Sequence, residues 1–167
     1  MTIEKAIKTA IEYEIRIRDI YRDATAAVDD EVGKRIFETL CKDEQHHIDY
    51  LQYKLEQLQD TGTIVPERLD SAIPSQEVLN REAEKVKSLV AKDFLGIRRQ
   101  MLSKALKMEI ETSDFYQKMV NELPAEGRAL FERFLEIENN HIKAVQFELD
   151  YLSKTGYWFD IKEFDME

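Results

Sequence analysis

The sequence predicts an all-α protein folded as a four-helix bundle of two helix pairs. Only five Gly and three Pro occur in 167 residues, and turns and bulges need those residue types. Apolar residues recur at the 3.6-residue spacing of a helix through four long stretches. The second half of the chain also repeats the first. With 43% hydrophobic residues, a chain of this length can close the core of a single domain over residues 1–167.

The first helix pair is expected at residues 3–28 and 31–59. The apolar stripe of the first helix contains a carboxylate, Glu14, and an aromatic residue two turns further on, Tyr21. Gly62 follows the second helix and can serve as its C-terminal cap, since glycine adopts the left-handed backbone that such caps need. We expect the first half of the repeat to end there, so that it covers about 3–62.

The connection between the two halves is expected at residues 63–96, and it contains two of the three prolines. A short helix at about 75–91 is predicted inside it, with a serine at its start as the cap. A connection of this length can cross from one end of a helical bundle to the other. We therefore read it as a crossover within one domain.

The second half of the repeat, about 97–156, is expected to hold helices at about 97–121 and 124–153, with Pro124 in the first turn of the later helix. The remaining segment, residues 157–167, is aromatic and acidic. We expect this tail to pack over one end of the bundle or against a second subunit, and a docking site for another protein is the alternative.

Two Glu-x-x-His motifs interrupt the apolar stripes of the second and fourth helices, at Glu44 with His47 and at Glu138 with His141. Residues three apart share one face of a helix, so each pair presents a carboxylate oxygen and an imidazole nitrogen to one point. A buried carboxylate is costly unless it is paired or binds a metal. Two such interruptions at one spacing favour a metal site.

The internal repeat covers both halves. Glu14 and Tyr21 match Glu109 and Tyr116 at an offset of 95 residues, and the two Glu-x-x-His motifs match at an offset of 94. Two helix pairs related by a pseudo-twofold axis would bring the matched side chains to one place. The repeat also pairs Tyr21 with Tyr116, and simple packing as core aromatics is one interpretation of them.

The repeat also selects among neighbouring carboxylates. It rejects Glu12 and Glu111, which align with basic residues, and Asp43, which aligns with Ile137. Four carboxylates and two imidazoles remain as candidate ligands: Glu14, Glu44, His47, Glu109, Glu138 and His141. One Glu from each of two helices with a Glu-x-x-His from each of the others is the ligand set of di-iron and di-manganese carboxylate bundles.

The two Glu-x-x-His motifs, each preceded by a matched helix with Glu and Tyr seven residues apart, resemble the ferritin-like superfamily, and within it the rubrerythrin-like proteins. The resemblance covers residues 3 to about 60 and 97 to about 153. It implies that Glu44 and Glu138 bridge two metal ions. One ion would also take Glu14 and His47, the other Glu109 and His141, with Tyr21 and Tyr116 as donors that orient the carboxylates.

By the same resemblance, the cofactor would be two iron ions, with manganese as the alternative, and the activity an oxidation–reduction with hydrogen peroxide or dioxygen. Rubrerythrins often carry a rubredoxin domain with four cysteines, whereas this chain has one cysteine, so we expect a separate electron donor. Peroxide-reducing relatives have an extra Glu where this chain has Thr112. An iron-binding or iron-sensing protein with little turnover is the alternative function, and ferritin-type storage is a third.

The net charge of −10 would repel phosphate backbones and anionic lipids, so we expect neither nucleic acid nor a membrane as partner. The first residues form no apolar block of the signal-peptide kind, and no apolar run approaches the roughly 18 residues of a membrane span. A cytoplasmic protein is the expectation. Because each half supplies two helices and three ligands, we also expect a homodimer, with a domain-swapped dimer as one form.

Overall fold

The computed structural model describes residues 1–65, 67, 69–73 and 96–155. Within these ranges the chain forms four long helices and no strand: α1 (Ile3–Ala27), α2 (Glu31–Thr61), α4 (Gly96–Glu122) and α5 (Ala125–Thr155). The expected all-α bundle of four helices is therefore confirmed. The short helix expected at 75–91 and the tail at 157–167 lie outside the described residues.

The ends of α2 follow from local chemistry. The Asp30 side chain accepts a hydrogen bond of 2.9 Å from the Val32 backbone N–H, which would otherwise have no partner within the helix. At the other end Gly62 has φ of 76°, and its N–H donates to the Leu58 carbonyl at 2.8 Å. Glycine adopts that left-handed conformation without a steric cost, as the sequence predicted.

The start of α5 differs by one residue from the expectation. The helix begins at Ala125, so Pro124 precedes the first turn instead of lying inside it. The Pro124 carbonyl accepts the Arg128 N–H at 2.9 Å, which makes Pro124 the capping residue. This position tolerates proline because a capping residue needs no helical hydrogen bond from its own N–H.

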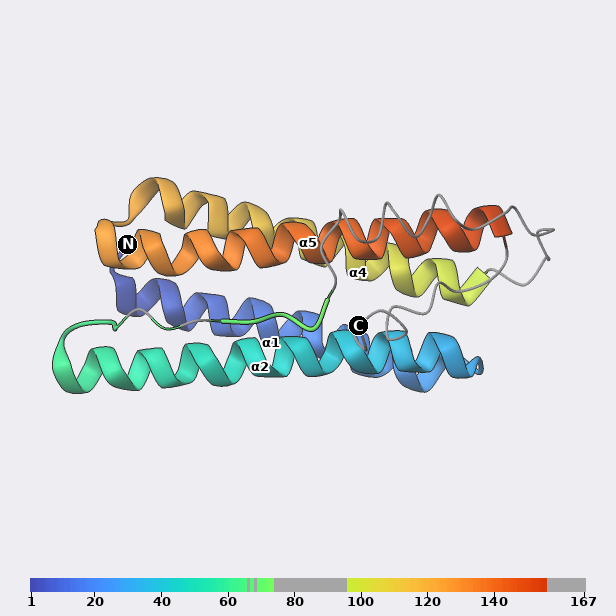
Figure 1. The fold of residues 1–167 in the computed structure, drawn as a ribbon, viewed down its shortest axis with the longest axis horizontal. Coiled ribbons are helices and arrows are strands. Elements are labelled where there is room, and N and C mark those ends of the chain that lie inside the picture. Colours follow the sequence, from blue (N-terminus) through green and yellow to red (C-terminus); the bar gives the residue numbers. More distant parts are fainter. Residues whose placement is uncertain (66, 68, 74–95, 156–167) are drawn as a thin grey trace.

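The four helices run close to parallel with the long axis of the molecule (Figure 1). α1 packs mainly on α2, α4 packs mainly on α5, and the two pairs meet along α1 and α4. The colours of Figure 1 show that α2 and α4 run in the same direction. The connection must therefore return along the bundle, and a helix of 31 residues such as α2 is about 46 Å long.

Two apolar clusters fill the interior, one in each half of the bundle. One includes Ile17, Tyr21, Phe37, Leu40, Ala105 and Ala144. The other includes Ala10, Leu51, Phe115, Phe134 and Ile137. Each helix contributes to both clusters, and on each helix the candidate ligands fall between the two contributions. The clusters therefore enclose a polar layer near the middle of the bundle.

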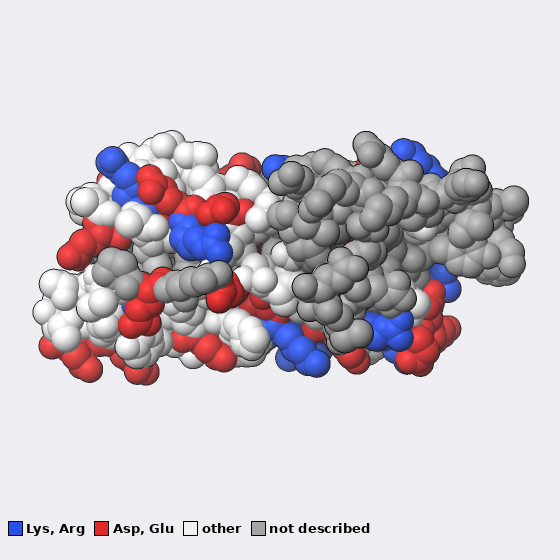
Figure 2. All heavy atoms as spheres, viewed as in Figure 1, with Lys and Arg blue, Asp and Glu red and all other residues white. Residues whose placement is uncertain are grey.

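Charged side chains of both signs are interspersed over the part of one face that the described residues cover (Figure 2). The described ion pairs on the helix surfaces include Lys8 with Glu4 at 2.7 Å and Arg133 with Glu136 at 2.9 Å. Such exposed pairs contribute little to stability. Among the described residues, none of the helices is both long and apolar enough to span a bilayer.

Candidate metal centre

The six candidate ligands lie together in the polar layer, and each has a relative exposure of 0%. α1 and α4 each contribute one glutamate, whereas α2 and α5 each contribute a glutamate and a histidine. The carboxylates that the repeat rejected on α1 and α4, Glu12 and Glu111, are exposed, and so is His46 beside His47. The selection by the repeat thus agrees with the burial at these positions.

The six residues form two groups of four potential ligands. One group is Glu14, Glu44, His47 and Glu138, and the other is Glu44, Glu109, Glu138 and His141. Within each group the ligand atoms lie within 4.8 Å of one another. Glu44 and Glu138 belong to both groups, so the arrangement has the form of two adjacent ion positions with two shared carboxylates.

Glu44 directs one oxygen toward each histidine. His47 Nδ1 lies 3.1 Å from Glu44 Oε2 and 3.1 Å from Glu14 Oε2. His141 Nδ1 lies 2.7 Å from Glu44 Oε1 and 3.6 Å from Glu109 Oε1. Both imidazoles therefore turn Nδ1 toward the carboxylates. A carboxylate with one oxygen beside each imidazole is placed as a bridge between two ions would be.

Several of these buried polar atoms have no hydrogen-bond partner among the described residues. They are Glu44 Oε1, His47 Nε2, Glu109 Oε2, both Glu138 oxygens and His141 Nδ1. His141 Nδ1 and Glu44 Oε1 are close but are not aligned as a hydrogen bond. A buried polar group without a partner costs about 1–3 kcal/mol, and more if it is charged. Cations among these atoms would satisfy them, and a carboxylate and imidazole set suits iron, manganese or zinc.

The carboxylates differ in pKa because they compete within one buried layer. Burial, together with the charges of Glu14 and Glu109, raises the pKa of Glu44 to about 8, although the nearby imidazoles oppose the rise. Burial and the neighbouring carboxylates also raise the pKa of Glu138 well above its ordinary value. Burial acts in the same direction on Glu14, but the charge of His47 and the hydrogen bonds with Glu44, His47 and Tyr116 together outweigh it and lower the Glu14 pKa. Without metal, protons therefore occupy part of the layer.

The two histidines supply positive charge when no metal is bound. Burial would lower the pKa of His47, but Glu14 and Glu44 outweigh burial and raise it to about 10. For His141 burial acts in the same direction, and Glu44, Asp43 and Glu109 raise the pKa well above its ordinary value. A metal ion must displace these protons, because a ligating imidazole nitrogen carries no proton.

The two tyrosines donate across the junction of the helix pairs. The Tyr21 hydroxyl on α1 donates to Glu109 Oε1 on α4, and the Tyr116 hydroxyl on α4 donates to Glu14 Oε1 on α1. Burial and the adjacent carboxylates raise the pKa of both phenols well above the ordinary value. Both tyrosines therefore stay protonated and hold one oxygen of each glutamate, which leaves the other oxygen for an ion.

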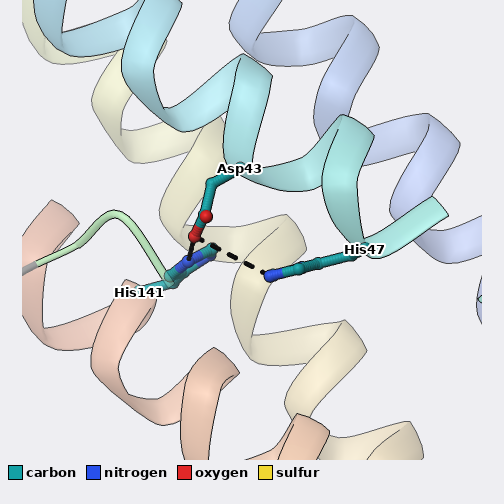
Figure 3. Close-up of side chains that lie close together, drawn as sticks. All are labelled: Asp43, His47 and His141. Atoms are coloured by element: carbon teal, nitrogen blue, oxygen red, sulfur yellow. Dashed lines mark hydrogen bonds and ion pairs between the residues drawn. The ribbon is translucent and has the colours of Figure 1, made fainter. Parts of the chain in front are cut away.

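Asp43, which the repeat rejected, faces the Nε2 atoms of the two imidazoles (Figure 3). His141 Nε2 donates to Asp43 Oδ2 at 2.7 Å, and His47 Nε2 lies 3.7 Å from the same oxygen. Asp43 also accepts hydrogen bonds from the Ser71 hydroxyl at 2.7 Å and the Ala72 N–H at 3.0 Å. Rejecting Asp43 was therefore wrong for the site as a whole, because this carboxylate fixes His141 and ties the connection to it.

The error has a physical cause. The repeat detects only features that both halves share, and Ile137 at the matching position of α5 cannot accept a hydrogen bond. One signal in the sequence was available, since Asp43 precedes His47 by four residues and so lies on the same helix face. Burial opposes ionisation of Asp43, but His141 and His47 outweigh it and hold the pKa of this carboxyl well below its usual range.

Thr112 lies three residues beyond Glu109 on α4, about one helical turn away. Its side chain is buried, and its hydroxyl donates to the Met108 carbonyl one turn earlier at 2.9 Å. The hydroxyl is thus engaged with the helix backbone. The matching residue on α1 is Ile17, which is also fully buried. Neither position offers a seventh carboxylate.

Replacing Asp43 by Ala is expected to weaken metal binding about 10- to 100-fold, the usual cost of losing the group that holds a ligating histidine. His141 would lose its acceptor and the freedom of its ring would increase. Competition with a chelator of known affinity measures the change. Asp49→Ala on the exposed face of the same helix is the control, and equal affinities for the two variants would contradict the role of Asp43.

No protein-family model, curated protein or solved structure matches this chain. The candidate centre therefore rests on its own geometry. That geometry can hold two cations a few ångströms apart, with anionic oxygen ligands that suit the higher charge of an oxidised metal. It also encloses them between two apolar clusters that limit access of water.

Proposed function

We propose that this chain is a ferritin-like, rubrerythrin-like oxidoreductase that uses two iron ions and an external electron donor to reduce hydrogen peroxide or dioxygen. The observation that carries the proposal is the pair of buried ligand groups that share Glu44 and Glu138. A site that only stored charge or stabilised the fold would not need two ion positions with common carboxylates. Two neighbouring irons would supply the two electrons that convert hydrogen peroxide and two protons into two water molecules.

The residues of this chain have distinct tasks in that reaction. The six ligands would bind the two iron ions, and the anionic oxygens of the four glutamates would stabilise the ferric state. Tyr21 and Tyr116 orient Glu109 and Glu14 through their hydroxyl groups. Asp43 accepts the Nε2 proton of His141, which leaves Nδ1 of that ring for the metal. The apolar clusters keep bulk water from the layer, so that electrons pass to the oxidant and not to side reactions.

The test is a comparison of two neighbouring histidines. The wild-type chain, loaded with ferrous iron without oxygen, is expected to bind two ions and to turn over peroxide when a chemical reductant is supplied. His47→Ala should lose most of this activity, whereas His46→Ala, changed at an exposed position, should keep it. Binding of iron without turnover in the wild type would overturn the proposal and favour the iron-binding or sensing alternative.

The identity of the metal is decided by elemental analysis of protein purified without added metal. Iron at two ions per chain supports the proposal. Manganese at the same stoichiometry would keep the site and change the chemistry, because the ligand set suits both metals. The mass of the protein in solution separates a storage function from an iron or a manganese enzyme, since ferritin-type storage needs a large shell of subunits.

The environment of Thr112 predicts that both histidines keep their ligand positions in both oxidation states. No carboxylate at position 112 or 17 can replace an imidazole when the charge of the metal changes. Crystal structures of the reduced and oxidised forms measure this. A metal–histidine separation that grows by more than about 1 Å, half of a typical bond of about 2.0–2.1 Å, would contradict it. Thr112→Glu is the variant in which such a movement is expected.

A homodimer remains a prediction. A single chain supplies all six ligands, so the site is complete within one copy and a domain swap is not required for it. Sedimentation at micromolar concentration is expected to give twice the chain mass of 19.7 kDa. A monomer mass would contradict the expectation. Reducing conditions exclude a disulfide between two chains, so the measurement needs no further control for a covalent dimer.

A further inference from the structure

A cavity of about 110 Å³ lies between the first half of α5 and the described part of the connection. We call it the access pocket, and its apolar walls are formed by Tyr50, Ile64, Val65, Ala129, Leu130 and Phe134. An apolar cavity of about 150 Å³ can bind benzene or xenon. The access pocket is therefore of a size for a diatomic gas or another very small molecule.

Phe134 separates the access pocket from the candidate metal centre. Its ring is fully buried and lines the pocket, and it packs in a T-shaped arrangement with the His47 ring, with centroids 5.6 Å apart and planes at 82°. The same ring also packs against the rings of Tyr50 and Tyr116, with ring centroids 5.9 Å and 5.4 Å away. A molecule in the pocket thus lies one aromatic ring away from a candidate ligand of the metal.

The charged side chains that line the pocket do not favour an anionic ligand, because the one basic residue is already paired and the others are acidic. Arg133 donates two hydrogen bonds to the Leu69 carbonyl, at 3.0 and 2.7 Å, and pairs with Glu136 at 2.9 Å. The other charged lining residues, Glu67 and Glu126, are acidic and exposed. The Tyr50 hydroxyl already donates to the Glu67 carbonyl at 3.0 Å. An uncharged molecule that needs no hydrogen bonds fits these walls best.

We infer that the access pocket binds dioxygen and delivers it past Phe134 to the metal centre. This inference rests on the proposed function, because it concerns how an oxidant reaches that site. In the reaction it serves, two ferrous ions become ferric, and dioxygen with two protons becomes hydrogen peroxide. The buried centre needs such a route, since all six ligands have no exposed surface.

Xenon binding tests the pocket without any metal. Xenon occupies apolar cavities that accept dioxygen, so crystals of the metal-free full-length chain under xenon should show it between Val65 and Ala129. Ala129→Trp on α5 and Val65→Trp in the connection fill the cavity from two separate segments and should each abolish that peak. Both positions are exposed, so the larger side chains can enter without disturbing the core. Ala26→Trp, at an exposed position on α1, is the matched control and should keep the peak.

Stopped-flow oxidation of the ferrous-loaded chain tests delivery. The two pocket-filling variants should bind iron as the wild type does, yet react with dioxygen about tenfold more slowly, equivalent to about 1.4 kcal/mol in the barrier. Phe134→Leu, which shortens the barrier between pocket and His47, should react faster. The Ala26→Trp control should match the wild type in both measurements.

The outcomes distinguish this inference from the proposed function. If the wild type reacts with dioxygen and both filled variants react equally fast, the access pocket is not the route, and the proposed function stands. Absence of xenon from the pocket of the wild type would also overturn the inference. If the ferrous-loaded wild type consumes neither dioxygen nor peroxide, the proposed function itself fails.

Discussion

Glu44→Ala is expected to purify with fewer than two metal ions per chain and to unfold more easily than the wild type. Glu44 is the residue that places one oxygen beside each histidine, at 3.1 and 2.7 Å. Its loss therefore weakens both ion positions at once. Removing one partner of a buried ionic cluster costs about 3–5 kcal/mol, and the lost metal adds to that because binding energy contributes to folding. Elemental analysis and chemical denaturation measure the two effects.

Two further variants separate charge from packing. Glu38→Ala, at an exposed position on α2, should keep the metal and the stability of the wild type. Glu44→Gln keeps the size of the side chain but not its charge, so it should retain most of the metal-free stability and lose metal. If folded Glu44→Ala retains two ions per chain, Glu44 does not bridge them and the site is assigned wrongly.

Metal removal is expected to reverse the pH dependence of stability. In the metal-free chain the folded pKa of Glu44 is about 8 against an ordinary 4.5, and that of His47 is about 10 against 6.5. Both groups hold protons more strongly when folded, so the unfolding free energy contributed by them is present at low pH and falls as pH rises. Glu14 and Glu109 have lowered pKa values, and their contribution is lost only below pH 4.5. From about pH 5 to 9 the metal-free chain should therefore become less stable.

With metal bound the sign changes, because protons and metal compete for the same atoms. Stability should then rise with pH, and at a free metal concentration 1,000 times the Kd each site should add about 4 kcal/mol. Thermal unfolding at pH 5, 7 and 9, with excess metal and with chelator, measures both trends. A metal-free midpoint temperature that rises over this range would contradict the assignment of the raised pKa values to this layer.

The sequence determined the helices and the six candidate ligands. Apolar spacing predicted the four helices to within a few residues, because an amphipathic helix of that length has one stable way to bury its stripe. The repeat then singled out Glu14 and Glu109 from their neighbours. Each is a charged residue within the apolar stripe of its helix, and the two occupy matching positions of the repeat. All six residues are buried together, as that selection required.

Only the tertiary structure decided what surrounds the ligands. The part played by Asp43 depends on His141 in α5 and Ser71 in the connection, 98 and 28 residues away, and no spacing along one helix encodes such a meeting. The access pocket likewise exists because Val65 and Ala129 approach from separate segments. Periodicity reports which face of a helix is buried, whereas the partner that a buried atom finds depends on how different helices and loops are brought together.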